Sequence, residues 1–384
     1  MKYFISAGEA SGDIHAAALI RAIMAEDPAA AVTFLGGDLM AEAAGCPPLI
    51  DYRRMAYMGF SEVLRHLPDI SRNLRTARRA IEVLRPDAVI LVDYPSFNLK
   101  LAAHAHSLGI PVYYYISPKV WAWKEWRVKK IRSYVREVFS ILPFEPAFYA
   151  RHGVAVTYVG NPSVAEVDER VARLGSFDGF CSRHGLDPSR PVIALVPGSR
   201  RGEIRCNLPV MAEAAERFEG YQAVIAGAPG IDPDIYGAIT DLPVVDNATF
   251  ELMHHATAAL VTSGTATLEC ALLGTPQVVC YRSNGSRLAY SLMARLLKVS
   301  YVSLPNLIVD SPIVPEQLLH ECTPDILAER LGALLPVAPG CVAPAREAQL
   351  RGYADMRRRL GTSDAATVTA RKIVESKRVF NNES

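Results

Sequence analysis

Two short loops in the second half of the chain have the composition of an anion-binding site. In one of them an apolar run, 258–262, is followed by Ser263, Gly264 and Thr265, and then by a helical pattern. Small residues there let backbone N–H groups approach an anion at the positive end of the helix. Glu269 follows one helical turn later, where a carboxylate could accept both hydroxyl groups of a ribose. The order fits a nucleotide diphosphate and its ribose; the alternative is an ordinary Ser/Thr-capped helix.

The other loop follows the apolar run 192–196, which predicts a strand buried on both faces. Gly198 and Ser199 give the following turn a free choice of backbone conformation, and the guanidinium of Arg200 suits a diphosphate. The alternative for Arg200 is a surface ion pair with Glu203. Two such loops at the carboxyl ends of strands favour a nucleotide site, because ligands of open parallel sheets collect at that edge.

The loop 8–13, Gly-Glu-Ala-Ser-Gly-Asp, connects the first predicted strand to the first helix. It resembles a dinucleotide-binding turn, but Glu9 would face the phosphates, so a Rossmann NAD site is disfavoured. We interpret the loop as binding hydroxyl or amine groups of a sugar through Glu9, Ser11 or Asp13. The alternative is that Ser11 and Asp13 cap the helix.

A further carboxylate, Asp93, follows the apolar run 88–92. Tyr94 precedes a proline and is therefore biased to an extended conformation, which would end the strand and orient Asp93. A carboxylate at the carboxyl end of a strand is a candidate general base for an incoming hydroxyl group. The alternative is an ordinary Asp-containing turn.

The stretch 117–130 combines aromatic residues and cations. It contains all three tryptophans of the chain, Trp121, Trp123 and Trp126, and five cations that include Lys129. This composition is typical of a membrane interface or of a site for an anionic amphiphile. Nucleic-acid stacking and a half-exposed helix that packs its rings on the core are the alternatives.

A second apolar patch lies earlier in the chain and consists of Met55, Met58 and Phe60, flanked by arginines. Methionine-rich patches suit irregular apolar shapes such as acyl chains, although such residues more often fill cores.

Composition narrows the classes of protein. A net charge of +1 argues against bulk nucleic-acid binding. The seven cysteines have no disulfide or metal-ligand spacing, so we expect reduced thiols, a cytoplasmic protein and no metal or other cofactor. The amino terminus has no signal-peptide pattern, and no apolar run is long enough to span a bilayer.

Strand patterns alternate with helical patterns along most of the chain, which predicts α/β domains with parallel sheets. With 384 residues the chain suits two Rossmann-like domains that face a central cleft. We expect an amino-terminal domain over 1–165, a linker over 166–190 and a nucleotide-binding domain over 191–345. The charged helical tail, 346–384, would pack across to the first domain or to another protomer, or it would close its own domain.

Several of these motifs together resemble those of the lipid-A-disaccharide synthases. The similarity is colinear from the first strand to about residue 330 and rests on 8–13 (GEASGD), 58–64 (MGFSEVL), 93–98 (DYPSFN), 117–123 (SPKVWAW), 197–200 (PGSR), 263–269 (SGTATLE) and 301–306 (YVSLPN). The resemblance implies the GT-B fold and a metal-independent, inverting glycosyltransferase. Such an enzyme joins UDP-2,3-diacylglucosamine to 2,3-diacylglucosamine 1-phosphate (lipid X), giving the β-1,6-linked lipid A disaccharide 1-phosphate and UDP.

The resemblance also implies roles for single residues. Asp93 takes the place of the general base, Glu9 lies on the acceptor side, and Arg200, Glu269 and Asn306 line the UDP side. One departure is that many relatives read Glu-Leu-Leu-Gln where this chain has 316–319, Glu-Gln-Leu-Leu, so no role is carried over to that glutamine.

The family further implies work at the inner face of the cytoplasmic membrane and includes homodimers whose carboxyl-terminal segments are exchanged. Two alternative functions are considered beside the glycosyltransferase. One is a GT-B UDP-N-acetylglucosamine epimerase, which needs no apolar surface, and the other is a non-catalytic membrane-docking anion-binding protein, which has little use for Asp93.

Overall fold

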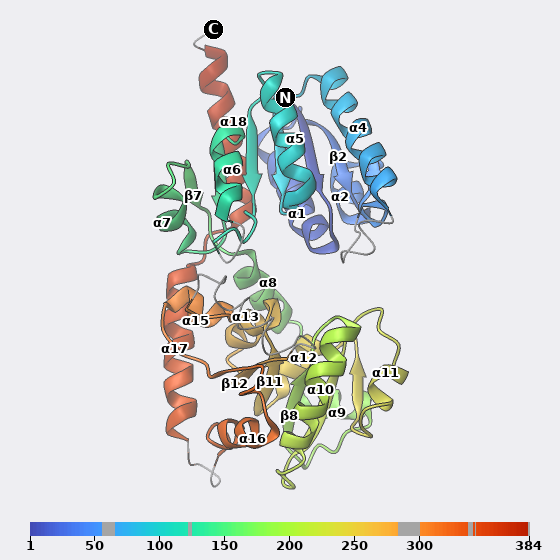
Figure 1. The fold of residues 1–384 in the computed structure, drawn as a ribbon, viewed down its shortest axis with the longest axis vertical. Helices are drawn as coiled ribbons and strands as arrows, with labels where there is room; N and C mark the ends of the chain where they lie inside the picture. Colours follow the sequence, from blue (N-terminus) through green and yellow to red (C-terminus); the bar gives the residue numbers. More distant parts are fainter. Residues whose placement is uncertain (56–65, 122–124, 283–299, 337–340, 342, 383–384) are drawn as a thin grey trace. The chain divides into compact units, whose positions relative to one another are not determined.

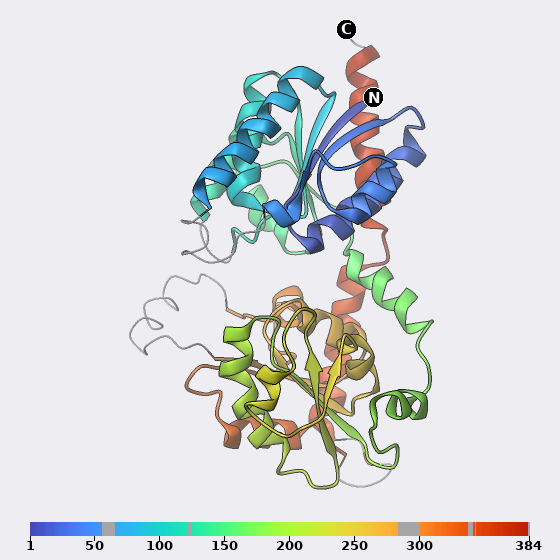
Figure 2. The same ribbon diagram turned by 90° about the vertical axis from the view of Figure 1, so that its right-hand side faces the viewer.

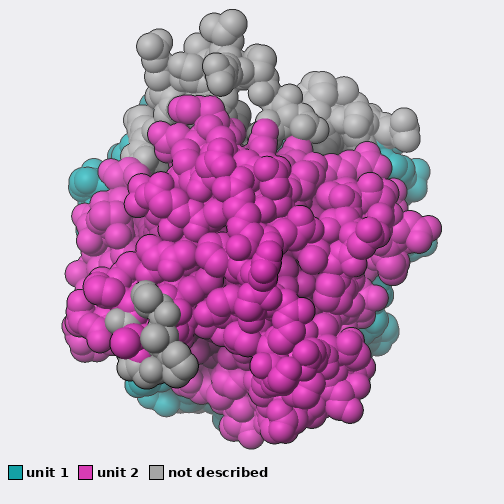
Figure 3. Space-filling model, turned by 90° about the horizontal axis from the view of Figure 1, so that it is seen from below, with its two compact units in different colours: residues 1–162, 362–384 teal, residues 163–361 magenta. Residues whose placement is uncertain are grey.

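The computed structural model describes residues 1–55, 66–121, 125–282, 300–336, 341 and 343–382 (Figure 1). The chain forms two compact units, coloured in Figure 3. Unit 1 contains residues 1–162 and 362–384, and unit 2 contains residues 163–361. The carboxyl-terminal end of the chain is therefore part of the amino-terminal unit.

Unit 1 is built on a parallel sheet in which the described strands have the order β3-β2-β1-β4-β5-β6-β7. The strands are β1 (Lys2–Ala7), β2 (Ala31–Gly36), β3 (Ile50–Asp51), β4 (Ala88–Val92), β5 (Val112–Tyr115), β6 (Glu137–Ser140) and β7 (Val156–Tyr158). The central strands β4 and β5 are buried along their whole length and β1 from Tyr3 onward, as expected when helices cover both faces of a sheet.

The helices of unit 1 lie on both faces of this sheet (Figures 1 and 2). One face carries α1 (Ala10–Glu26), α2 (Asp38–Ala44) and α18 (Ala365–Asn382), and the other carries α4 (Leu67–Leu84), α5 (Pro95–Ser107) and α6 (Val128–Tyr134). The short α7 (Glu145–Ala150) precedes β7. Buried residues of α18, among them Ala370 and Ile373, share one core with α1, β1 and β4.

Unit 2 has a second parallel sheet, with the order β10-β9-β8-β11-β12-β13 among the described strands. They are β8 (Val192–Val196), β9 (Gln222–Gly227), β10 (Val244–Asp246), β11 (Ala258–Thr262), β12 (Gln277–Tyr281) and β13 (Glu316–Leu318). Buried residues of α10 (Arg201–Ala215), α11 (Asp234–Gly237) and α16 (Pro324–Gly332) pack on one face. Those of α9 (Phe177–His184), α12 (Thr249–His255) and α13 (Thr265–Leu272) pack on the other.

Two helices overlap the predicted linker, 166–190. These are α8 (Pro162–Val171) and α9, so the stretch 166–190 contains the end of one helix and the whole of another. The tail divides between the units: α17 (Pro344–Leu360) contacts α15 (Leu304–Val309) in unit 2, whereas α18 contacts α1 in unit 1.

Each sheet reverses its strand order at one point, and the candidate loops follow the strands at that point. In unit 1, β2 follows β1 on one side of the sheet and β5 follows β4 on the other side. β1 and β4 are neighbours, and Ala7 pairs with Val92 at their ends. In unit 2 the same holds for β8 and β11, where Val196 pairs with Val261. The crevice outside such a switch point is the usual ligand site of open parallel sheets.

Candidate functional site

The backbone of the loop after β8 contacts the carboxylate of Glu203. Gly198 has a φ of +117°, and a Cβ atom there would lie 2.6 Å from Oε2 of Glu203. The same oxygen accepts the N–H of Ser199 at 3.1 Å. Arg200 donates to Oε1 of Glu203 at 3.2 Å, and its side chain is 68% exposed. The surface ion pair considered as the alternative is therefore present, and the guanidinium still faces solvent.

The loop after β11 exposes small residues at the start of α13. Gly264 and Thr265 are exposed, and Ser263 donates its hydroxyl to the carbonyl of Val302 at 3.1 Å. Glu269 lies one turn further along α13 and is partly buried. Burial and the charge of the nearby Glu166 raise the pKa of Glu269, while Arg170 opposes them. The switch point thus brings the Ser199–Arg200 loop and the Ser263–Thr265 loop onto neighbouring strand ends.

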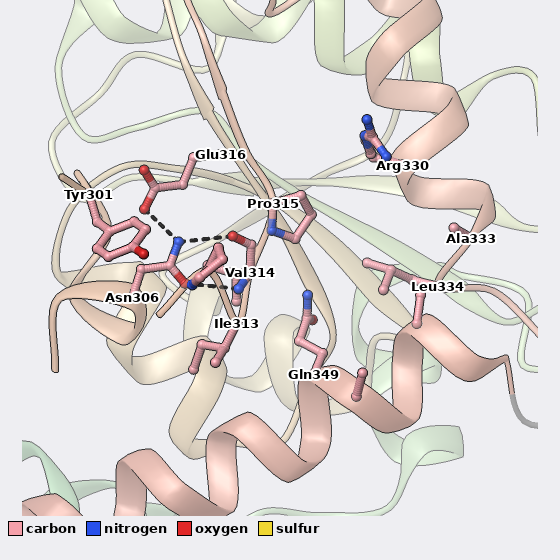
Figure 4. A pocket seen from close by; sticks show the side chains of 13 residues that line it. Tyr301, Asn306, Ile313, Val314, Pro315, Glu316, Arg330, Ala333, Leu334 and Gln349 are labelled. Atoms are coloured by element: carbon pink, nitrogen blue, oxygen red, sulfur yellow. Dashed lines mark hydrogen bonds between the residues drawn. The ribbon is translucent and has the colours of Figure 1, made fainter. Parts of the chain in front are cut away.

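Asn306 has a structural task in unit 2 (Figure 4). Its amide nitrogen donates to the carbonyl of Val314 at 2.9 Å and to Glu316 at 2.8 Å, and its amide oxygen accepts the N–H of Val314 at 2.9 Å. The side chain is buried beside a cavity of about 650 Å³. Because these bonds use both ends of the amide, Asn306 shapes the loop rather than presenting a free amide group.

Glu316 is a residue that the sequence patterns did not single out. Its carboxylate accepts the backbone N–H groups of Val302 and Ser303, at 3.0 and 2.9 Å, at the start of α15. Val302 in turn accepts the hydroxyl of Ser263. Glu316 therefore connects the Asn306 loop to the Ser263 loop. Glu316 begins the segment 316–319 discussed above, but that motif indicated no role for its carboxylate, and only the fold reveals one.

A second unpredicted residue, Asn207, lies buried on α10. Its amide oxygen accepts the N–H of Arg282 after β12 at 2.8 Å, and its nitrogen donates to the carbonyl of Pro197 after β8 at 3.4 Å. Asn207 therefore ties together the ends of two strands next to the candidate nucleotide loops.

In unit 1, Asp93 stands at the carboxyl end of β4 in an unusual backbone conformation. Asp93 and Tyr94 have φ values of +41° and +47°, in the left-handed region. The proline that follows Tyr94 predicts an extended conformation for it, and this prediction is wrong. Tyr94 occupies the N-cap position of α5. Burial raises the pKa of the Asp93 carboxyl group, and the positive charge of Lys119 opposes this shift. Lys119 follows the neighbouring strand β5.

The loop after β1 lies beside Asp93 because β1 and β4 are neighbours. A Cβ atom on Gly8 would lie 2.3 Å from the ring of Tyr94, so only glycine leaves room for that ring. Glu9 is partly exposed at the first position before α1, and Ser11 is exposed in the first turn. The structure thus brings Glu9 and Ser11 to the same sheet edge as Asp93.

Asp13 has a different task from the predicted sugar contact. Its carboxylate accepts three backbone N–H groups at the start of α2, those of Gly37, Leu39 and Met40, at 2.7, 3.2 and 3.2 Å. The side chain is buried. Asp13 therefore caps a helix, as the alternative predicts, but the helix that it caps is α2 and not α1.

The structure also corrects two members of the predicted membrane surface. Trp121 is only 9% exposed, and its indole N–H donates to the buried carboxylate of Glu145 at 3.0 Å. Met55 is 1% exposed, and its carbonyl accepts the hydroxyl of Tyr94 at 2.5 Å. Both residues belong to the core of unit 1, because an apolar side chain with interior partners gains more by packing there than at a surface.

Trp126 fits the predicted surface. It is 58% exposed, and the cations of Arg127 and Lys130 each lie 5.7 Å from its ring centre. Lys129 is exposed in the same segment. The other predicted members, Met58, Phe60 and Trp123, lie outside the described residues. Within the described part of the chain, no helix is long and apolar enough to cross a membrane.

Comparison with known proteins gives a consistent family. The family model for lipid-A-disaccharide synthetase matches residues 3–337. The lipid-A-disaccharide synthase of Myxococcus xanthus is 41% identical over 384 residues, covering 97% of both chains. That of Geobacter sulfurreducens is 38% identical over 384 residues, again with 97% of each chain covered.

Solved structures agree in fold at low identity. The UDP-GlcNAc 2-epimerase of Neisseria meningitidis, bound to UDP-GlcNAc, has a TM-score of 0.67 at 13% identity and covers 98% of this chain and 100% of its own. A calicheamicin glycosyltransferase has a TM-score of 0.58 at 15% identity, with 98% of each chain covered. The predicted fold class, two Rossmann-like domains of the GT-B type, is confirmed. From the family model and the relatives, the chain belongs to the lipid-A-disaccharide synthase family.

Proposed function

We propose that this protein is an inverting glycosyltransferase that transfers 2,3-diacylglucosamine from UDP-2,3-diacylglucosamine to lipid X. The products are the β-1,6-linked lipid A disaccharide 1-phosphate and UDP. The observation that carries this proposal is the match of residues 3–337 to one family, together with a relative that is 41% identical with 97% of each chain covered. The epimerase alternative is supported only by likeness in fold.

For the donor, we propose that the UDP diphosphate binds at the start of α13 and at Arg200. Exposed Gly264 and Thr265 offer backbone N–H groups at the positive end of a helix, and Ser199 is exposed in the loop after the neighbouring strand. Negative charge that develops on the leaving UDP would be stabilised there. Glu269 would accept the ribose hydroxyls, and Asn306 and Glu316 would hold the adjoining loop in place.

For the acceptor, we propose that Asp93 takes the proton from the 6-hydroxyl group as it attacks the anomeric carbon. The raised pKa of Asp93 supports this role, because a carboxylate is a stronger base when its pKa lies closer to the working pH. Glu9 and Ser11 would orient the acceptor sugar. Asp93 belongs to unit 1 and Arg200 to unit 2.

For the membrane, we propose peripheral association at the inner face of the cytoplasmic membrane through Trp126 and its neighbouring cations. An exposed indole with cations beside it is the side-chain chemistry of a lipid headgroup region. For a homodimer, the exchangeable element is α18, because its contacts with α1 would be the same with the α1 of a partner.

The function is tested by measuring UDP release from UDP-2,3-diacylglucosamine with and without lipid X, and by identifying the disaccharide by mass. We expect release only with lipid X, and about a hundredfold slower turnover for Asp93→Ala. An epimerase would convert UDP-N-acetylglucosamine without any acceptor, and a docking protein would release no UDP. Near-normal turnover of Asp93→Ala would overturn the assignment of the base.

The donor residues are tested separately by calorimetric titration with UDP. Removal of one partner of a charge-assisted hydrogen bond costs about 1.5–3 kcal/mol, so Arg200→Ala and Glu269→Ala should each bind UDP about ten- to a hundredfold more weakly. The matched control is Arg201→Ala, which removes an exposed arginine one position further along. Unchanged affinity in both test variants would place the nucleotide elsewhere.

A further inference from the structure

The backbone that carries Asp93 is strained in a way that the surrounding fold must maintain. Asp93 and Tyr94 are two consecutive non-glycine residues in the left-handed region, and Ile116 after β5 is a third nearby, with φ of +58°. Side-chain-bearing residues occupy this region at a cost and persist there only when neighbouring contacts fix them.

Both peptide groups that flank the Cα atom of Asp93 are held by hydrogen bonds. On one side, the N–H of Asp93 donates to the carbonyl of Ile116 at 3.2 Å. On the other side, the carbonyl of Asp93 accepts the phenol of Tyr114 at 2.5 Å and the amide of Asn98 at 2.8 Å. When both peptide planes are fixed, the direction of the Cα–Cβ bond is fixed as well, and the carboxylate keeps only its own side-chain rotations.

The two donors are themselves well anchored. Tyr114 and Asn98 are fully buried. The amide of Asn98 also reaches the carbonyl of Val92 at 3.1 Å, and its oxygen accepts the hydroxyl of Ser6 on β1 at 2.7 Å. Burial raises the pKa of Tyr114 well above its usual value, so the phenol stays protonated and remains a donor over the working pH range.

We propose that Tyr114 and Asn98 are positioning residues that aim the Asp93 carboxylate at the acceptor hydroxyl. The inference rests on the proposed role of Asp93 as the general base. Neither residue touches substrate in this scheme; each acts through the carbonyl oxygen of Asp93. A misplaced base is costly, because a shift of about 1 Å in a reacting group can lower the rate about a hundredfold.

The test compares two buried tyrosines on the same strand. Tyr114→Phe removes the hydroxyl that holds Asp93, whereas Tyr113→Phe removes a hydroxyl that bonds to Ser376 on α18 at 2.5 Å. Both variants keep the ring and therefore the packing. We expect Tyr114→Phe to lower kcat about tenfold with an unchanged Kd for UDP, and Tyr113→Phe to keep kcat within about twofold of the wild type.

A double-mutant cycle with Asp93→Ala distinguishes positioning from a general structural role. If Tyr114 acts through Asp93, Tyr114→Phe should cause no further loss of kcat in the Asp93→Ala background. Ser6→Ala, which frees the amide of Asn98 without removing it, should behave in the same way with a smaller loss.

Three results would overturn the inference, and they have different meanings. Equal kcat for Tyr114→Phe and Tyr113→Phe, with Asp93→Ala impaired, would reject positioning and leave the base assignment intact. An equal loss from Tyr114→Phe in both backgrounds would show that the hydroxyl only supports the fold. Near-normal kcat for Asp93→Ala would reject the base assignment, and the positioning role with it.

Discussion

Replacement of Asp13 by alanine should destabilise unit 1 while leaving the chemistry of the folded enzyme intact. The carboxylate of Asp13 accepts three backbone N–H groups of the segment that starts α2. These donors have no helical partners of their own, because the first N–H groups of any helix lack them. Alanine would leave them without an acceptor at a buried position.

The size of the effect follows from the number and quality of these bonds. A hydrogen bond to a charged group contributes about 1.5–3 kcal/mol, but two of the three are long, at 3.2 Å, and the three are not additive. We therefore expect a loss of about 3 kcal/mol. For a domain of this size each 1 kcal/mol lowers Tm by about 2–4 °C, so the transition of unit 1 should fall by about 9 °C. Asp13→Asn, which keeps one acceptor oxygen, should lose less.

Calorimetry of Asp13→Ala, with hydrogen exchange of α2 as a local readout, measures this effect. Glu9→Gln is the matched control, since it changes a carboxylate in the same loop that makes no such cap. Glu9→Gln should keep its Tm and lose turnover, whereas Asp13→Ala should lose Tm and, below its transition, keep turnover. A Tm within 1–2 °C of the wild type, or turnover lost at full stability, would refute the structural role of Asp13.

Three further predictions concern the same unit. Turnover should fall as the pH drops through the pKa of Asp93. Because the charge of Lys119 lowers that pKa, Lys119→Met should move the acidic limb of the pH–rate profile to higher pH. An acidic limb at the wild-type pH would contradict this. Trp126→Ala should reduce co-sedimentation with anionic vesicles at low salt, whereas Trp121→Phe should bind vesicles normally and melt at a lower temperature. Gly8→Ala should displace the Tyr94 ring and lower turnover about tenfold without changing UDP affinity in titration, and wild-type turnover would show that the ring moves freely.

The sequence predicted the strands and the loops at their ends, because both depend on short-range patterns. The apolar runs 88–92, 192–196 and 258–262 are β4, β8 and β11 with the same bounds. The strand order then explains why the loops meet in pairs. Alternating strands and helices predict a parallel sheet, and the reversal of strand order at β1/β4 and β8/β11 places the loops together.

Roles that depend on distant partners could not be predicted in the same way. Asp13 caps a helix that starts some two dozen residues later, and Trp121 donates to Glu145 at a similar separation. The type of these residues was informative, but the identity of each partner is decided by tertiary packing. Asn98 lay within a recognised motif, yet its contact with the carbonyl of Asp93 depends on the left-handed turn, which no sequence pattern indicated.

The discontinuous course of unit 1 has a consequence for the order in which the protein folds during synthesis. Residues 163–361 form a unit that is synthesised in full before α18. Unit 1, although β1 is synthesised before all of unit 2, shares its core with Ala370 and Ile373 of α18. The amino-terminal unit therefore keeps an exposed apolar face until α18 emerges, whereas the core of the carboxyl-terminal unit does not need α18. A chain that stops at residue 361 would keep the second unit whole and leave the first permanently unfinished.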